Sequence, residues 1–468
     1  AKPDLQGGGL MARPRKNAAK VQGSLLAPDE VAEIPVEEQP YPLPEGWKWV
    51  RLGDITEIVG GGTPSSRVKE YYDNGNIPWL SPADLSDYHE IYICRGKKML
   101  TVKGLNSSSA RMIPAETVCL SSRAPIGYVV IAKNPLCTNQ GFKSFLPSHL
   151  YIPKFLYWYL KGNKPLLESY ASGKTFLELS GAKAAQIEFP LPPLGEQQRI
   201  VDRIESLFAK LDEAKAKAES VLDGFEIRKA AILHKAFTGE LTAKWREIRG
   251  IKKENNTVKI KDIISDIKYG TSEKSDYTYT GLPVIRIPNI TGSSVDLEDL
   301  KFLKSSKSSD YDLVERNDIL MIRSNGSREL VGKCALVDEA IVGKAYASFL
   351  IRLRPNPTIN PKYLLGFLNS SLARNQLFAK AKSSAGIHNI NSKEICSVDI
   401  WLPDKKEQQE IVRILDNLLA KERHIREAAE NALSQIDLMK KAILARAFRG
   451  ELGTHGSARD TLQNNGSM

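Results

Sequence analysis

Apolar and small residues recur in steps of four and three near the C-terminal end of the chain, at Ile411, Leu415, Leu418, Ile425, Ala429, Ala432, Ile436, Met439 and Ile443. One step of seven passes over Glu422. This heptad spacing is typical of a helix that packs along one face against another helix. The same pattern, 211 positions earlier, runs from Ile200 to Ile232, with Arg228 as its polar exception. The periodicity therefore predicts two long amphipathic helices with equivalent faces.

The two helices belong to an internal repeat. GEQQRIV at 195–201 returns as KEQQEIV at 406–412, and KAAILHKAFTGEL at 229–241 returns as KKAILARAFRGEL at 440–452. Both pairs are 211 positions apart, so the helical part of the repeat contains no gap. Near the front of each copy, VRLGDI resembles VKIKDI. The chain is therefore a duplicated unit, a module followed by a long helix.

The ends of these helices suggest their arrangement. Asp404 and Glu407 predict a capping box at the start of the second helix, and Gly239 and Gly450 are expected terminators. Each helix of roughly 42 residues would be about 63 Å long. Because the second module begins and ends at the far end of the first helix, we expect the second helix to return antiparallel.

The predicted fold class is α+β, with two α/β modules separated by two long antiparallel helices that form a coiled coil with pseudo-two-fold symmetry. Short β-rich runs alternate with Gly-, Ser- and Asn-rich loops in each module, and a short helix is expected after Pro153 and after Pro361. The predicted boundaries are a disordered, tag-like extension at 1–45, module 1 at 46–193, helix 1 at 194–243, module 2 at 244–403, helix 2 at 404–453 and a disordered tail at 454–468.

Charge and composition narrow the possible partners. The formal net charge of +11 suits a polyanionic partner such as nucleic acid. The five cysteines are scattered, without a Cys-x-x-Cys pair, which favours a reducing cytoplasm. No apolar run approaches the length of a membrane span, so we expect a cytoplasmic protein without a membrane partner.

Searches for enzyme motifs find none. Residues 173–175 read GKT, like the end of a phosphate-binding loop, but the earlier glycine of that motif is Glu168. An Asp/Asn-Pro-Pro-aromatic motif for amino-methyl transfer is absent, as is a nuclease-type acidic core, and the histidines lack metal-ligand spacing. We therefore expect no catalytic residues, no metal and no cofactor in this chain.

Each module carries residue types suited to DNA. Glycines allow close backbone approach, Arg and Asn can read guanine and adenine edges, and lysines can neutralise phosphates. For any single residue the alternative is structural, since a Gly-Ser-Asn loop is usually a turn. The predicted DNA-binding residues are Gly61, Gly62, Thr63, Ser81, Ser122 and Arg123 in module 1 and Gly270, Thr271, Arg286, Asn289, Arg323, Asn325 and Arg328 in module 2. Candidate phosphate contacts are Lys97, Lys98, Lys103, Lys301, Lys304 and Lys307.

From about Pro44 to Leu452 the chain resembles the specificity subunits of Type I restriction–modification enzymes. The resemblance is strongest in the two P-x-x-x-EQQ-x-IV helix starts, the two AIL-x-x-AF-x-GEL helix ends, and GGGTP followed by GNIPWLSPADL. It implies two target-recognition domains, each reading one half of a split, asymmetric site in double-stranded DNA. It also implies that the helices set the gap and dock two methyltransferase subunits, and through them two motor-nuclease subunits. S-adenosylmethionine, ATP and Mg²⁺ would then belong to those partners.

Two questions stay open at this point. Docking of the partner subunits is predicted for Glu196, Gln197, Gln198, Glu407, Gln408 and Gln409, but acids and amides at a helix start also satisfy free N–H groups. The alternative function is a coiled-coil adaptor that holds two protein-binding modules and binds no DNA. Salt-sensitive binding to duplex DNA distinguishes the adaptor from the specificity subunit.

Overall fold

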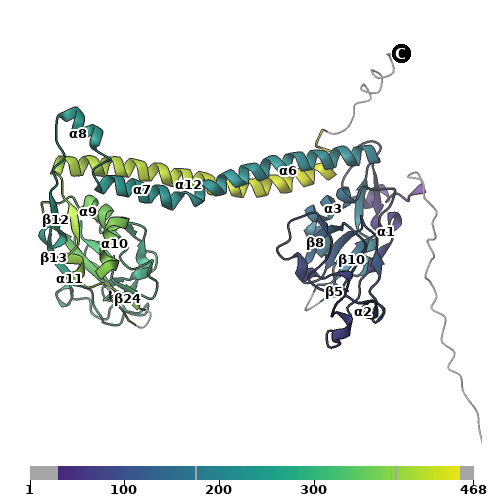
Figure 1. Cartoon of the computed structure of the whole chain (residues 1–468), viewed down its shortest axis with the longest axis horizontal. Helices are drawn as coiled ribbons and strands as arrows, with labels where there is room; N and C mark the ends of the chain where they lie inside the picture. Colours follow the sequence, from purple (N-terminus) through teal and green to yellow (C-terminus); the bar gives the residue numbers. More distant parts are fainter. Residues whose placement is uncertain (1–29, 174–176, 381, 385–386, 454–468) are drawn as a thin grey trace, which may run out of the picture. The chain divides into compact units, whose positions relative to one another are not determined.

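The computed structural model describes residues 30–173, 177–380, 382–384 and 387–453. They form two compact units: unit 1 runs to Ala214 and resumes at Ser434, and unit 2 runs from Lys215 to Leu433. Each unit therefore contains one predicted module together with parts of the long helices, labelled α6, α7 and α12 in Figure 1. The expected tag and the tail at 454–468 lie outside the described residues.

The first long helix has an irregularity at one residue, whereas the second is continuous. α6 (Leu194–Asp223) and α7 (Phe225–Phe237) are separated at Gly224, and α12 (Lys405–Phe448) extends over 44 residues. Gly224 N still donates to the Ser220 carbonyl at 3.2 Å and Arg228 N to the Gly224 carbonyl at 3.0 Å, so the predicted long helix is present as α6 and α7 in succession. Glycine has the lowest helix propensity after proline, which explains why the irregularity falls at this residue.

The helix ends largely follow their sequence signals. Gly239 and Gly450 have φ values of +79° and +73°, the left-handed conformation expected just beyond a helix. Asp404 Oδ1 accepts a hydrogen bond from Glu407 N at 2.7 Å, which is one half of the predicted capping box. The Glu407 carboxylate instead binds Arg246 of α8 (Ala243–Arg249), a short helix that the sequence reading did not separate from its surroundings.

Inside unit 2 the two long helices are antiparallel. From the start of α7, Phe225 lies under Arg426 and then Arg228 binds Glu422. At the end of α7, Phe237 lies beside Gly366, as does Leu415 of α12. The two polar exceptions in the heptad pattern thus pair with each other, Arg228 Nε lying 2.9 Å from Glu422 Oε2. This arrangement, with the two α/β modules, confirms the predicted fold class.

The described part of unit 1 contains a five-stranded, a four-stranded and a two-stranded sheet, with short helices packed against them. The strand orders are β2-β10-β7-β8-β4 and β5-β3-β9-β6, β1 pairs with β11, and α3 packs against β7 and β8. The strands are β1 (Lys48–Arg51), β2 (Ile58–Gly60), β3 (Ile77–Leu80), β4 (Tyr92–Ile93), β5 (Met99–Leu100), β6 (Met112–Ile113), β7 (Val118–Ser122), β8 (Ile126–Ala132), β9 (Leu136–Thr138), β10 (Phe142–Phe145) and β11 (Glu188–Leu191). The helices are α1 (Leu52–Ile55), α2 (Val102–Asn106), α3 (Pro153–Gly162), α4 (Lys164–Ser169) and α5 (Gly181–Ala185).

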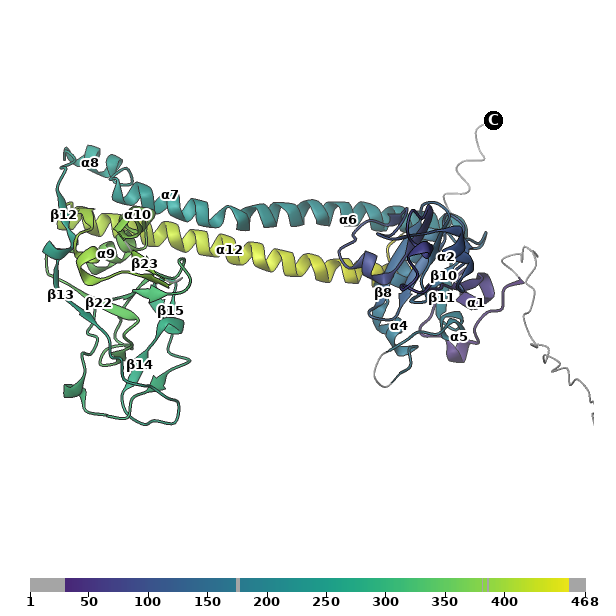
Figure 2. The same ribbon diagram turned by 60° about the horizontal axis from the view of Figure 1, so that its bottom comes forward.

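Unit 2 repeats this plan, and Figure 2 shows its β13 beside β22. The strand orders are β13-β22-β18-β20 and β17-β14-β21, with β12 paired to β25 and β24 between β19 and β23. The strands are β12 (Thr257–Lys259), β13 (Ile264–Tyr269), β14 (Pro283–Ile285), β15 (Ile290–Thr291), β16 (Ser294–Val295), β17 (Lys301–Phe302), β18 (Ile319–Ile322), β19 (Ser324–Asn325), β20 (Cys334–Leu336), β21 (Ala345–Tyr346), β22 (Leu350–Pro355), β23 (Lys382–Ser384), β24 (Ile387–Asn389) and β25 (Asp399–Trp401). The helices are α9 (Pro361–Leu368), α10 (Ser371–Lys380) and α11 (Ser392–Cys396). The helices predicted after Pro153 and Pro361 are thus α3 and α9.

The repeated Ala-Phe near each helix end anchors the helix to a module. Phe237 packs edge-on against Tyr363 at a centroid distance of 5.2 Å in unit 2, and Phe448 packs against Phe155 and Tyr159 at 5.2 and 5.0 Å in unit 1. Aromatic side chains bury large areas and hold a preferred ring geometry. Each module core therefore includes the end of a long helix.

Residues 30–45 of the N-terminal extension are packed against the rest of unit 1, contrary to the prediction of disorder. Val31 and Ile34 are buried in the core of unit 1, and Ile34 N donates to the Trp49 carbonyl at 2.8 Å. The Tyr41 hydroxyl donates to the Phe448 carbonyl at 3.1 Å. The predicted disorder is therefore wrong for residues 30–45, because two apolar side chains in a proline-rich stretch find a place in the core.

Candidate functional site

The two modules match residue by residue where three neighbouring strands end. In unit 1, Lys143 of β10 pairs with Gly60 of β2, and Phe142 pairs with Ser121 of β7. In unit 2, Ile351 of β22 pairs with Tyr269 of β13, and Leu350 pairs with Ile322 of β18. The next residues follow the same rule, since Ser122 N donates to the Gly141 carbonyl at 2.7 Å, and Arg323 N donates to the Phe349 carbonyl at 2.9 Å. We call this place the strand-end site, formed in unit 1 by Gly60, Ser122, Arg123, Gly141 and Glu178 and in unit 2 by Tyr269, Arg323, Ser324, Phe349 and Asn389.

The glycines predicted to approach phosphates are needed by the chain's own backbone. A Cβ on Gly61 would lie 2.1 Å from the Asn139 carbonyl oxygen, and one on Gly270 would lie 2.2 Å from the Tyr346 carbonyl oxygen. At Gly62 a Cβ would meet the Ala110 nitrogen at 2.1 Å. The absence of a side chain at these positions is therefore explained by packing, and gives no support to a phosphate contact.

Threonines next to these glycines differ in exposure. Thr271 takes the place of Gly62, since Thr271 N donates to the Tyr346 carbonyl at 2.8 Å and Gly62 N donates to the Thr138 carbonyl at 2.9 Å. The Thr271 hydroxyl also accepts from Glu273 N at 3.1 Å. Thr63 is exposed, and its role stays a prediction.

The predicted DNA-binding residues Ser81 and Asn289 shape the loop after β3 and its counterpart after β14. Ser81 Oγ binds Asp84 at 2.7 Å and caps a short helical turn. Asn289 is 2% exposed; its oxygen accepts from Arg286 N, and its amide nitrogen donates to the Asp296 and Asp299 carbonyls. These hydrogen bonds give Asn289 a structural role inside the module and do not support base reading, which stays a prediction.

Arg286 is held by acidic and aromatic neighbours. Its Nη2 lies 2.9 Å from an Asp299 carboxylate oxygen, and its guanidinium lies 5.8 Å from the Tyr277 ring centroid. Only 19% of the side chain is exposed. A DNA contact by Arg286 would have to compete with this ion pair.

Arg323 and Arg328 lie on aromatic rings at the surface of unit 2. The Arg323 guanidinium is 4.7 Å from the Tyr269 ring centroid, and its Nη1 donates to the Ser348 carbonyl at 3.1 Å. Arg328 is exposed and lies 4.9 Å from the Phe378 ring centroid. Asn325 Oδ1 accepts from Ser327 N at 2.8 Å and shapes the turn between the two arginines.

In unit 1 the corresponding position combines a hydroxyl and charged groups. Ser122 is buried, and its Oγ lies 3.3 Å from the Nζ of the buried Lys143. Burial lowers the pKa of the Lys143 ammonium, while the nearby Glu178 carboxylate opposes that shift. Arg123 lies 3.8 Å from Glu178, and both side chains are more than a third exposed. Ser122 is thus a partner of Lys143 inside the module, whereas Arg123 is accessible.

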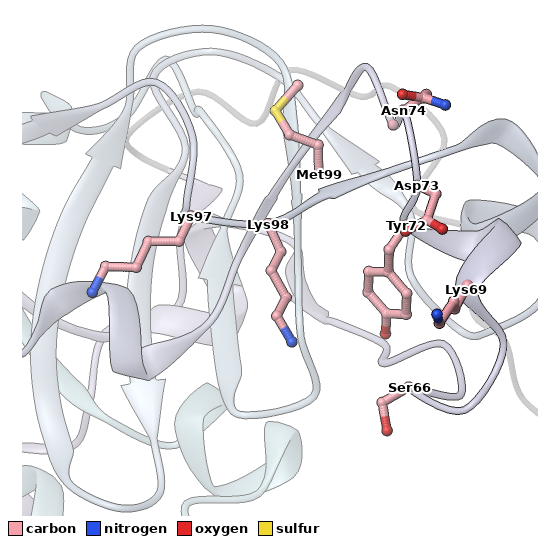
Figure 3. Close-up of a pocket in the computed structure, with 9 residues that line it drawn as sticks. Ser66, Lys69, Tyr72, Asp73, Asn74, Lys97, Lys98 and Met99 are labelled. Carbon is pink, nitrogen blue, oxygen red and sulfur yellow. The ribbon is translucent and has the colours of Figure 1, made fainter.

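A basic hollow of about 460 Å³ lies elsewhere on unit 1, lined by Ser66, Lys69, Tyr72, Asp73, Asn74, Gly75, Lys97, Lys98 and Met99. Figure 3 shows Lys98 and Lys69 pointing into the space around Tyr72, and Lys98 Nζ is 5.7 Å from the Tyr72 ring centroid. Lys97 and Lys98 were candidate phosphate contacts, whereas Lys69 and Tyr72 had no sequence signal beyond their residue type. Lys103 pairs with Glu70, which leaves its charge partly neutralised.

The two Glu-Gln-Gln motifs are mostly buried. Gln197 accepts from Ile152 N at 2.8 Å and donates to the Leu150 carbonyl at 2.9 Å, and Gln408 accepts from Asn360 N at 2.7 Å. These amides fix the chain just before α3 and α9. Glu196 and Glu407 are 4% and 5% exposed. Burial gives Glu196, Gln197, Glu407 and Gln408 a structural role and leaves little of them for a partner, whereas Gln198 and Gln409 are exposed. Partner docking by this motif stays a prediction.

Among the described residues there is neither a membrane-spanning helix nor a cluster of metal-ligand side chains. None of the helices in the described ranges has the length and apolar content needed to cross a bilayer. The same residues include no group of three or more His, Cys, Asp and Glu side chains placed to hold a metal ion.

The twin modules, their matched strand ends and the paired helices define a two-domain recognition protein. The family model for the Type I restriction modification DNA specificity domain matches residues 44–221 and 252–435. The chain belongs to this family. It is a specificity subunit of a Type I restriction–modification system, a non-catalytic subunit with two target-recognition domains, here called recognition domains 1 and 2.

Individual relatives are similar to the chain over most of its length or over part of it. The EcoKI specificity subunit of Escherichia coli strain K12 is 28% identical over 425 residues, which cover 88% of this chain and 90% of that protein. The MjaIX specificity subunit of Methanocaldococcus jannaschii is 42% identical over 183 residues, 39% of this chain and 42% of that protein. The crystal structure of the HsdS subunit from Thermoanaerobacter tengcongensis has the same fold, with a TM-score of 0.62 at 20% identity, covering 88% of this chain and 99% of that one.

Proposed function

We propose that each recognition domain reads one half of a bipartite, asymmetric DNA site and that the antiparallel helices set the gap between the halves. The strand-end site is the observation that supports this most. The equivalent backbone hydrogen bond joins Ser122 to Gly141 in domain 1 and Arg323 to Phe349 in domain 2. A common scaffold with different side chains suits two readers with different sequences.

The proposal includes partners that supply the chemistry. Two methyltransferase subunits and two motor-nuclease subunits would assemble with the chain, in the cytoplasm, and would bring S-adenosylmethionine, ATP and Mg²⁺. The exposed Gln198 and Gln409 at the helix starts are candidates for the methyltransferase contact. The basic hollow with Lys69, Lys97 and Lys98 is a candidate contact for the DNA backbone, because ammonium groups neutralise phosphates whatever the base sequence.

Exchange of one domain tests this proposal. Residues 46–190 are replaced with the recognition domain of another family member, the chain is assembled with its methyltransferase partner, and methylated sites are mapped by sequencing. We expect one half-site to change and the other to stay the same, since each domain has its own core. A change in both half-sites would contradict independent reading. The chain assembled with its methyltransferase partner should bind duplex DNA in a salt-sensitive manner, which an adaptor without DNA affinity would not do.

A further inference from the structure

The strand-end site of domain 2 is built to present one arginine in a fixed plane. We propose that Arg323 reads a guanine in the second half-site, that Tyr269 orients its guanidinium, and that Phe349 contacts the neighbouring base pair. This rests on the proposed reading of DNA by each domain and names the residues that perform it in domain 2.

Arg323 is held on two sides and has hydrogen-bonding capacity left. Its guanidinium lies 4.7 Å from the Tyr269 ring centroid, and Nη1 donates to the Ser348 carbonyl. Its Nε is buried and has no hydrogen-bond partner among the described residues, so the N–H groups that can face a base are those on Nη1 and Nη2. A guanidinium offers five N–H donors in a planar fork, so donors remain for the two acceptors on the major-groove edge of guanine. Holding the fork beforehand lowers the entropy lost on binding.

Tyr269 is itself fixed. Its hydroxyl oxygen accepts from Ser392 N at 2.9 Å and lies 3.2 Å from Ser392 Oγ. The residue is 43% exposed at the end of β13, and its ring faces the arginine. Tyr269 is therefore a positioning residue that acts through Arg323.

Phe349 completes the site with an exposed apolar surface. Its carbonyl accepts from Arg323 N at 2.9 Å, so the two residues are adjacent, and the side chain is 55% exposed. An apolar side chain beside a base-reading arginine can contact a thymine methyl group. A purely structural role would favour burial of so large a ring.

Domain 1 lacks all three side chains at the equivalent positions. Gly60 stands for Tyr269, Ser122 for Arg323 and Gly141 for Phe349. A Cβ at Gly60 would meet no atom within 4 Å, so packing does not prevent a larger residue there. The accessible charges are Arg123 and Glu178, which lie opposite each other as Ser324 and Asn389 do in domain 2. The two domains should therefore prefer different base pairs at this position.

Three variants of the full chain, assembled with its methyltransferase partner, test the proposal: Arg323→Ala, Tyr269→Gly and Phe349→Gly. The substrates are duplexes in which each position of the second half-site carries each of the four base pairs, and the readout is the rate of methyl transfer. Arg323→Ala should lower the preference for guanine at one position about 10- to 100-fold and leave the first half-site unchanged. Tyr269→Gly should weaken the same preference to a smaller extent, and Phe349→Gly should affect an adjacent position.

Arg316→Ala is the matched control, because Arg316 is a 68% exposed arginine of the same domain whose partner is the equally exposed Glu339. The control should leave every preference unchanged. The inference is overturned if Arg323→Ala keeps the full guanine preference, or if it slows methylation of all duplexes equally. A wild-type complex with no bipartite preference would instead refute the proposed function itself, so the two failures are distinguishable.

Discussion

A buried ion pair at the start of α12 gives the sharpest test of how the Glu-Gln-Gln motif works. Arg246 and Glu407 are bound to each other with side chains 8% and 6% exposed. Arg246 also donates to the Gly239 carbonyl at 2.6 Å and to Thr242 Oγ1 at 2.9 Å, and the Thr242 hydroxyl donates to Glu407 at 2.6 Å. The motif residue Glu407 therefore joins α12 to α8 and to the turn after α7.

Arg246→Ala should destabilise unit 2 strongly. The substitution leaves the Glu407 carboxylate buried with the Thr242 hydroxyl but without its counter-charge. Removing one partner of a buried pair costs about 3–5 kcal/mol. Unit 2 spans residues 215–433, 219 residues by difference, and for that size each kcal/mol lowers the Tm by about 2–4 °C. The expected decrease in the Tm of unit 2 is therefore about 6–20 °C.

Differential scanning calorimetry of the full chain measures this effect, with hydrogen exchange in α7 and α8 to assign the transition to unit 2. The double variant Arg246→Met with Glu407→Leu should recover most of the lost stability, because it removes both charges together. Arg413→Ala is the control, since Arg413 is 66% exposed on the same helix and its loss should be too small to measure. An Arg246→Ala protein that unfolds at the wild-type temperature would show that the pair does not stabilise unit 2. The motif would then need another explanation, such as direct partner binding.

Three further outcomes are expected. In the native chain a thiol reagent should modify the exposed Cys94 quickly and Cys119 only after unfolding, because burial raises the pKa of the Cys119 thiol to about 12. Mass spectrometry of the labelled peptides checks this. Rapid labelling of Cys119 in the native chain would contradict the fold of unit 1. Lys98→Glu should weaken DNA binding to a similar degree for all sequences and reduce the salt slope by about one, as measured by fluorescence anisotropy; a change confined to one sequence would contradict a phosphate contact. Seven residues inserted after both Ala218 and Ala429 should lengthen the gap between the two half-sites by at most about three base pairs, since seven residues add about 10 Å. Unchanged spacing with full activity would show that the helices do not set the gap.

The sequence was most informative where structure depends on neighbours along the chain. Heptad spacing located both long helices and the repeat, because helical periodicity is a local property. It did not predict the irregularity at Gly224, since the apolar pattern continues through that position without a gap. It also marked Arg228 and Glu422 as misfits, whereas the antiparallel register makes them partners. That pairing depends on two segments far apart in the chain, which periodicity alone cannot align.

Residue type alone did not separate candidate DNA contacts from residues that serve the fold. Gly61, Gly270 and Asn289 have the chemistry of DNA ligands, but the same properties meet needs of the fold, close backbone packing and satisfaction of buried carbonyls. Only exposure and hydrogen-bond partners separate the two uses. By that criterion Thr63, Arg123, Arg323 and Arg328 stay candidates.

Loop length explains why the strand-end site could not be found by aligning the repeat. The helical motifs are 211 positions apart, but Ser122 and Arg323 differ by 201 and Gly141 and Phe349 by 208. Insertions of different length between the strands therefore shift the register several times within each domain, while the backbone hydrogen bonds at the strand ends are kept. The two domains of this chain therefore differ in loop length and in the side chains at the strand ends, while the sheet hydrogen bonds are the same. Phe349 illustrates the consequence, because a lone phenylalanine in the turn between β21 and β22 has no sequence signal, and only its equivalence to Gly141 identifies it as a difference between the two domains.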